Sequence, residues 1–144
     1  MKLTTRILTL GLIVAGGMAF AEGEATDPTV KARQELMKTI GGNTKALGDM
    51  AGGKADFDAA KAEAAKAAIL AASAEIAAKF ETNATDPETE AKPEIWSNWD
   101  DFVNKADALK TAAGALDATS LDGVKAGMAG VGGACKACHT AYRM

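Results

Sequence analysis

Apolar residues recur every three or four positions along four stretches of the chain, and no stretch shows the period of two typical of a strand. The spacing predicts helices over residues 28–51, 55–80, 98–117 and 121–142. The joints between them are short, except for residues 81–93, which contain Pro87 and Pro93. The pattern therefore predicts an all-α fold, an antiparallel four-helix bundle with one long connection.

Each predicted helix has an apolar seam that we expect to face the core. In the first helix the seam is Val30, Arg33, Met37, Ile40, Thr44, Leu47 and Ala51. In the second it is rich in small residues that allow close helix packing, namely Phe57, Ala60, Ala64, Ala67, Ala71 and Ala74, beside the larger Ile69, Ile76 and Phe80. In the third it is Phe102, Ala106, Leu109, Ala113 and Leu116, and in the fourth Leu121, Val124, Met128, Val131, Cys135, Cys138 and Tyr142.

Polar residues mark the starts of these helices. Asp27 is placed to cap the first helix ahead of Pro28, and Ser120 precedes the last. Ser97 with Asp100 resembles a capping box for the third helix, with Asp in place of Glu.

Residues 1–21 have the pattern of an export signal. Lys2 and Arg6 precede an apolar run that is too short to span a bilayer, and Ala19-Phe20-Ala21 is a small-x-small cleavage site. The alternative is an uncleaved membrane anchor. We expect a mature domain of residues 22–144 in the periplasm, without membrane attachment once the signal is cleaved.

The net charge of the mature chain indicates which kinds of binding partner it favours. Removal of Lys2 and Arg6 leaves 14 basic and 19 acidic residues, so the mature chain has a net charge near −5. An acidic surface argues against binding to nucleic acid and to anionic lipid, and it favours a basic redox partner.

The chemistry of the chain is concentrated in Cys135-Lys136-Ala137-Cys138-His139, the C-x-x-C-H pattern of haem c attachment. Residues three apart share a face of a helix, so two thiols can each add to one vinyl group of one porphyrin. The neighbouring imidazole of His139 is then held beneath the ring as an iron ligand. The sequence therefore predicts one haem c, covalently bound through two thioethers.

Two other interpretations of the cysteine pair fit the sequence less well. A structural zinc site needs four protein ligands, whereas the chain has two cysteines and one histidine. A thioredoxin-like pair belongs at the start of a helix after a strand, but this pair lies late in a predicted helix.

Because the chain has a single histidine, a second histidine cannot ligate the iron on its distal side, opposite His139. Met37 is the best-placed side chain for that distal face, either as a ligand or as plain packing. Arg33 lies on the same seam, where a guanidinium needs an anion such as a haem propionate, unless it reaches out to water. Gln34 could donate to the same propionates. Arg143 follows His139 by one turn, near the proximal side of the ring, although a cation also suits a helix C-terminus.

These residues together resemble the cytochrome c′ family. The matches are C-K-A-C-H-x-x-Y-R at residues 135–143, R-Q-x-L-M at residues 33–37 and T-E-A-K-P-E-I-W at residues 89–96. The resemblance implies a periplasmic bundle, usually a homodimer, with five-coordinate high-spin haem that binds nitric oxide and carbon monoxide or carries electrons. It also implies Cys135 and Cys138 as thioether sites and His139 as proximal ligand.

The resemblance assigns further residues to the haem. Arg33, Gln34 and Glu90 match haem-contacting positions, and Arg143 matches the basic residue beside the proximal histidine. Met37 matches the residue that crowds the distal face. Low-spin relatives use a methionine from this part of the first helix as the sixth iron ligand.

Two functions therefore stay open. The first is a gas-binding protein with a vacant, apolar distal face that admits small neutral diatomic molecules. The second is a low-spin electron carrier with His139 and Met37 both on the iron. We do not expect an enzyme such as a peroxidase, because no histidine is left to act as a distal acid–base group.

Overall fold

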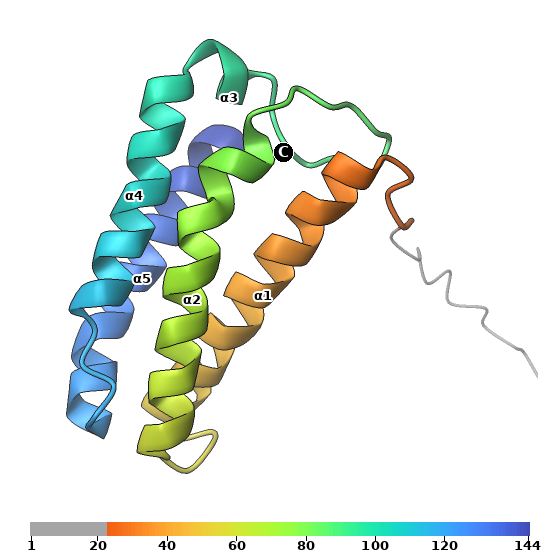
Figure 1. The fold of residues 1–144 in the computed structure, drawn as a ribbon. Helices are drawn as coiled ribbons and strands as arrows, with labels where there is room; N and C mark the ends of the chain where they lie inside the picture. Colours follow the sequence, from red (N-terminus) through yellow and green to blue (C-terminus); the bar gives the residue numbers. More distant parts are fainter. Residues whose placement is uncertain (1–22) are drawn as a thin grey trace, which may run out of the picture.

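The computed structural model describes residues 23–144, so the predicted export signal at residues 1–21 lies outside the described residues. Residues 23–144 form five helices (Figure 1), and none of these five is long and apolar enough to cross a membrane. They are α1 (Pro28–Ala51), α2 (Ala59–Phe80), α3 (Glu94–Ser97), α4 (Trp99–Ala115) and α5 (Leu121–Tyr142).

The four long helices form the predicted antiparallel bundle. α1 packs against α2 and α5, and α4 packs against α2 and α5, so the four helices enclose one core (Figure 1). The one-turn helix α3, which the sequence pattern did not predict, follows the long connection and leads into α4. The C-terminus lies beside this connection, near the start of α1 (Figure 1).

Capping explains where three of the helices begin. The Asp27 carboxylate accepts hydrogen bonds from the backbone N–H groups of residues 29 and 30, at 2.8 and 3.0 Å, as predicted. The Ser120 hydroxyl likewise accepts from the Gly123 N–H at 3.0 Å. α2 begins at residue 59 and not at 55 because Asp58 caps it, accepting from the Lys61 N–H at 3.0 Å.

The predicted capping box at Ser97 is wrong. Ser97 ends α3, and its hydroxyl donates to the Glu94 carbonyl at 3.3 Å. α4 begins after Asn98, whose side chain makes no capping hydrogen bond. The prediction failed because the short helix α3 occupies the residues that were expected to lead into the third helix.

The predicted inward face of α2 is also wrong in its alanine register. The alanines at 60, 64, 67, 71 and 74 are all exposed. The residues that α2 buries are Ala62, Ala65, Ile69, Ala72, Ser73, Ile76 and Phe80. The large side chains at 69, 76 and 80 determine which face turns inward, and alanine occurs on every face of this helix, so its positions carry little information.

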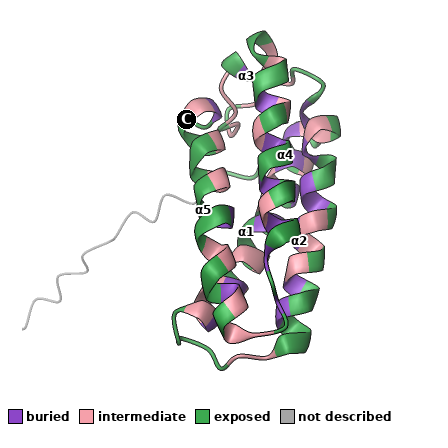
Figure 2. Cartoon of the chain, turned by 90° about the vertical axis from the view of Figure 1, so that its left-hand side faces the viewer, coloured by how far each residue is buried: buried purple, intermediate pink, exposed green. Residues whose placement is uncertain are grey.

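The core runs the length of the bundle, as Figure 2 shows by the buried residues that line the inner faces of the helices. All five seam residues predicted for the third helix are buried. In α1, Leu36 and Met50 are buried although the seam did not include them, while Met37, Thr44 and Ala51 are only half-buried. At the α3 end, Phe102 packs against Phe80, Trp99 and Tyr142 with ring centroids 5.2 to 5.5 Å apart.

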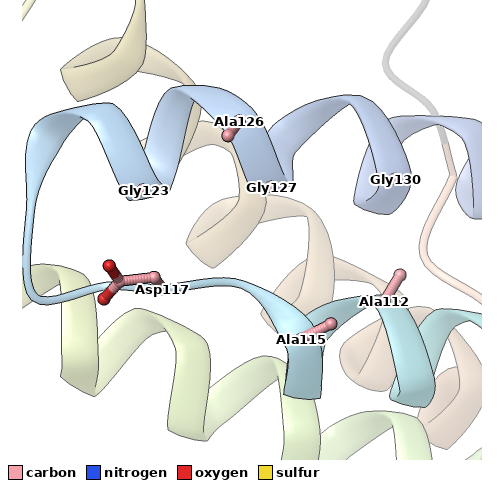
Figure 3. A pocket seen from close by; sticks show the side chains of 7 residues that line it. All are labelled: Ala112, Ala115, Asp117, Gly123, Ala126, Gly127 and Gly130. Atoms are coloured by element: carbon pink, nitrogen blue, oxygen red, sulfur yellow. The ribbon is translucent and has the colours of Figure 1, made fainter.

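Two glycines let the start of α5 lie directly against the end of α4. A shallow groove runs between these helices, lined by Ala112, Ala115, Asp117, Gly123, Ala126, Gly127 and Gly130 (Figure 3). A Cβ at Gly127 would lie 2.7 Å from Leu116 Cγ and 3.0 Å from its Cα. A Cβ at Gly123 would lie 2.6 Å from the Asp117 carbonyl oxygen. The 116–117 backbone therefore needs glycine at both positions.

We expect Gly127→Ala to lower the free energy of unfolding by about 1–3 kcal/mol, because the new methyl overlaps Leu116 Cγ and Cβ and lies against its Cα, and Cβ cannot move away without the backbone. The matched control is Gly41→Ala, at an exposed position inside α1 where a Cβ meets no atom within 4 Å. That substitution should stabilise the helix by about 0.5–1 kcal/mol. Denaturant unfolding measures both, and equal effects of the two substitutions would contradict the close approach.

Candidate haem site

The predicted attachment residues lie in the last two turns of α5. Cys135 and Cys138 are both half-buried, pack against the core cluster and are not joined in a disulfide. Burial raises the pKa of both thiols. The cysteines therefore line one inward-facing strip of the helix, as their spacing predicts.

His139 follows directly and is exposed on its helix. Desolvation lowers its pKa, the cationic Arg143 lowers it further, and the anionic Glu90 acts in the opposite direction. A neutral imidazole offers a nitrogen lone pair to a metal ion, so these surroundings favour the form that can bind iron.

The packing of α1 on α5 sets the level of Met37 relative to His139. A Cβ at Gly48 of α1 would lie 3.7 Å from Met128 Cε of α5, so these two residues face each other. The helices are antiparallel, and Met37 precedes Gly48 by the same eleven residues by which His139 follows Met128. Equal rise per residue then puts Met37 and His139 at the same level of the bundle.

Arg33 is buried, with 3% of its surface exposed, so its guanidinium does not reach out to water. Nε donates to the Lys79 carbonyl at 3.1 Å, and the two terminal nitrogens donate to the Thr82 and Ala84 carbonyls, the latter at 3.4 Å. The guanidinium carbon also lies 5.0 Å from the centre of the Phe80 ring and 5.2 Å from that of Trp96. Arg33 thus binds the C-terminus of α2, where carbonyl groups lack helical partners.

Gln34 and Asp86 hold the next part of the long connection. The Gln34 amide donates to the Glu88 carbonyl at 3.0 Å. The Asp86 carboxylate accepts from the N–H groups of residues 26, 27 and 88, each at 2.9 Å, and from the Thr26 hydroxyl at 3.0 Å. These hydrogen bonds lower the pKa of Asp86 to about 2. The sequence did not predict this role for Asp86, whose partners at 26 and 27 precede it by about sixty residues.

The connection ends against the C-terminus, where Glu90 meets Arg143. Glu90 Oε2 accepts from Arg143 Nε at 2.7 Å and lies 2.6 Å from Nη2. Residues 91 and 143 form an antiparallel β-bridge on the same stretch. The structure therefore brings together Glu90, Arg143 and His139, while Arg33 and Gln34 contact the connection that carries Glu90.

The donor set fits a haem c. Two thiols and an imidazole within five residues are the groups that bind this cofactor covalently and through its iron. Cys135 and Cys138 would hold the porphyrin, and His139 would bind its iron from the proximal side.

A four-helix bundle whose last helix carries C-x-x-C-H has the fold and site of a c-type cytochrome. A sequence model of the family described as cytochrome c′ matches residues 28–143, nearly all of the described chain. The chain belongs to the cytochrome c′ family, and members of this family bind haem c covalently.

Individual relatives agree with this assignment. The chain is 35% identical to cytochrome c-556 of Agrobacterium fabrum, covering 100% of this chain and 96% of the relative. It is 36% identical to cytochrome c′ of Rhodopseudomonas palustris, covering 96% and 95%. Among solved structures, cytochrome c prime from Shewanella frigidimarina has a TM-score of 0.73 at 31% identity, covering 80% of this chain and 93% of that one.

Several of the solved structures that resemble this chain contain bound nitric oxide. The nitric oxide complex of a variant of cytochrome c prime from Alcaligenes xylosoxidans has a TM-score of 0.69 at 33% identity, covering 80% of this chain and 93% of that one. The relatives thus include proteins named cytochrome c′ and proteins named cytochrome c-556.

Proposed function

We propose that this chain is a periplasmic haem c protein with five-coordinate, high-spin iron that binds nitric oxide and carbon monoxide and can also carry electrons. When bound, the haem would supply an iron atom that can bind the gas. Cys135 and Cys138 would fix the ring to α5, and His139 would ligate the iron.

The observation that carries the proposal is the register of α1 on α5. At the level of His139, α1 offers the apolar side chains Leu36, Met37 and Ile40. An apolar surface excludes water and anions but admits a neutral diatomic molecule at little desolvation cost. The only histidine already serves the proximal side, so nothing comparable is left to stabilise bound oxygen, and nitric oxide or carbon monoxide is favoured.

The same register favours a second candidate, a low-spin electron carrier. Met37 lies level with His139 and is half-buried, and its flexible thioether can reach different positions. If its sulfur ligates the iron, the sixth position is filled and the reduction potential is raised. Gas binding would then require displacement of Met37.

We expect the wild-type protein to give high-spin absorption spectra when oxidised and when reduced, and to bind carbon monoxide when reduced. Met37→Leu should leave the spin state unchanged, because it exchanges one apolar side chain for another of similar volume. The matched control is Met128→Leu, since Met128 shares the helix of His139 and is equally half-buried. Absorption spectra with and without carbon monoxide measure all three proteins.

The opposite result identifies the second candidate. Sharp low-spin bands and no response to carbon monoxide in the wild type contradict the five-coordinate proposal. Conversion to a high-spin spectrum by Met37→Leu, but not by Met128→Leu, then assigns the sixth ligand to Met37.

We further propose binding without catalytic turnover, because a haem enzyme needs a distal proton donor and acceptor, and Arg33 and Gln34 cannot act as bases.

The export pattern of residues 1–21 supports a periplasmic location. The acidic surface supports a basic redox partner. The exposed alanines at 60, 64, 67, 71 and 74 of α2 support a homodimer, because a second copy can pack closely on small side chains.

A further inference from the structure

Glu90 and Arg143 form an ion pair near His139, although they come from segments that are far apart in the sequence. Glu90 Oε2 lies 2.7 Å from Arg143 Nε and 2.6 Å from Nη2. Arg143 directly follows α5, and its N–H donates to the His139 carbonyl at 3.0 Å, so its cation stands at the end of the turn that carries the proximal ligand. Without Glu90, this positive charge would stand uncompensated beside His139.

The backbone fixes Glu90 in this position. The Lys92 N–H donates to the Tyr142 carbonyl at 2.9 Å, and the Met144 N–H donates to the Glu90 carbonyl at 2.8 Å. The bridge between residues 91 and 143 lies between these two hydrogen bonds. Residues 90–92 are thereby held alongside residues 142–144, which keeps the Glu90 carboxylate next to the last turn of α5.

The segment is also held from its other end. Arg33 binds the carbonyls at 79, 82 and 84, Gln34 binds the carbonyl at 88, and Asp86 binds backbone N–H groups ahead of α1. The connection is therefore tied to α1 and to the C-terminus along its length. A charge that is held in one place has a defined electrostatic effect on a nearby site, whereas the effect of a mobile charge is averaged over many positions.

We propose that Glu90 is a positioning residue for the proximal side of the haem: it holds the Arg143 guanidinium against residues 90–92 and balances its charge beside His139. The inference rests on His139 as the iron ligand, which both candidate functions share. Ferrous iron carries less positive charge than ferric iron, so an unbalanced cation nearby favours the reduced state and an unbalanced anion favours the oxidised state.

The test is the reduction potential of the haem-loaded protein, titrated at low ionic strength because salt screens half-exposed charges. Glu90→Gln should raise the potential, Arg143→Gln should lower it, and the double variant should return close to the wild-type value. Glu94→Gln, which removes an exposed acid four residues further along the chain, should shift the potential less than Glu90→Gln. Shifts of opposite sign in the two single variants support the inference.

A purely structural role gives a different pattern. If the pair only fastened the connection, both single variants would loosen the same contact and shift the potential in the same direction, with a common fall in unfolding temperature. A shift of the same sign, or no shift beyond that of Glu94→Gln, overturns the inference. Because the pair is half-exposed, we expect only small changes in unfolding temperature. The potential can be measured whether the iron is high-spin or low-spin, so failure here is separable from failure of the gas-binding proposal.

Discussion

The double variant Cys135→Ala/Cys138→Ala is expected to lose all covalently bound haem. The two thiols are the only sulfur nucleophiles in the chain that can form thioethers, since it contains two cysteines. Each single variant should retain one link and therefore part of the haem. The measurement is haem absorbance that stays with the polypeptide after denaturation and extraction with acidified organic solvent.

The control for this experiment lies inside the same motif. Lys136 is exposed between the two cysteines, so Lys136→Ala should leave haem loading unchanged. Full retention of haem by the double cysteine variant would contradict thioether attachment. Equal loss in Lys136→Ala would mean that the assay reports recognition of the motif during maturation and not the bonds themselves.

Arg33→Met is expected to lower the free energy of unfolding by about 2–4 kcal/mol, because it removes a buried guanidinium that donates to three partly buried carbonyl groups. Arg33 is 3% exposed and reaches the carbonyls of residues 79, 82 and 84. Arg33→Lys should be intermediate, since a single ammonium cannot span three acceptors as a planar guanidinium does. Denaturant unfolding followed by circular dichroism gives the free energies.

Lys38→Met is the matched control, because it removes an exposed cation from the same helix. We expect its effect to stay within about 0.5 kcal/mol, as for most surface substitutions. A loss no larger in Arg33→Met than in Lys38→Met would contradict the role of Arg33 in holding the connection. The haem absorption spectrum of Arg33→Met, recorded in parallel, reports separately on any contact between Arg33 and the cofactor.

Local signals made α1 and α5 predictable to the residue. Both helices begin after a capping side chain, Asp27 or Ser120, and their expected bounds of 28–51 and 121–142 match the structure. The sequence also indicated the antiparallel bundle, because short joints require neighbouring helices to run in opposite directions. The attachment motif could be predicted for the same reason, since all its residues lie within two turns of one helix.

The register of α2 could not be predicted from its alanines. Alanine is equally compatible with a buried and an exposed position, and only the spacing of residues 69, 76 and 80 marks the inward face. The short helix α3 was missed because a single turn has too few residues to show a period.

The contacts of the long connection depend on the fold as a whole. Arg33 reaches residues 46 to 51 positions away, and Glu90 meets Arg143 across 53 positions. An inward guanidinium could be expected to need acceptors, but the sequence does not state that backbone carbonyls at the end of α2 would supply them. The haem contacts of Arg33, Gln34 and Glu90 that the family resemblance implies stay predictions.

The most direct test of the central claim is the intact mass of the wild-type protein, purified from the exporting cell and measured under denaturing conditions. The account predicts the mass of residues 22–144 increased by that of one haem. After proteolysis, one added bond should be found at Cys135 and the other at Cys138. A mass equal to that of the bare polypeptide would contradict it.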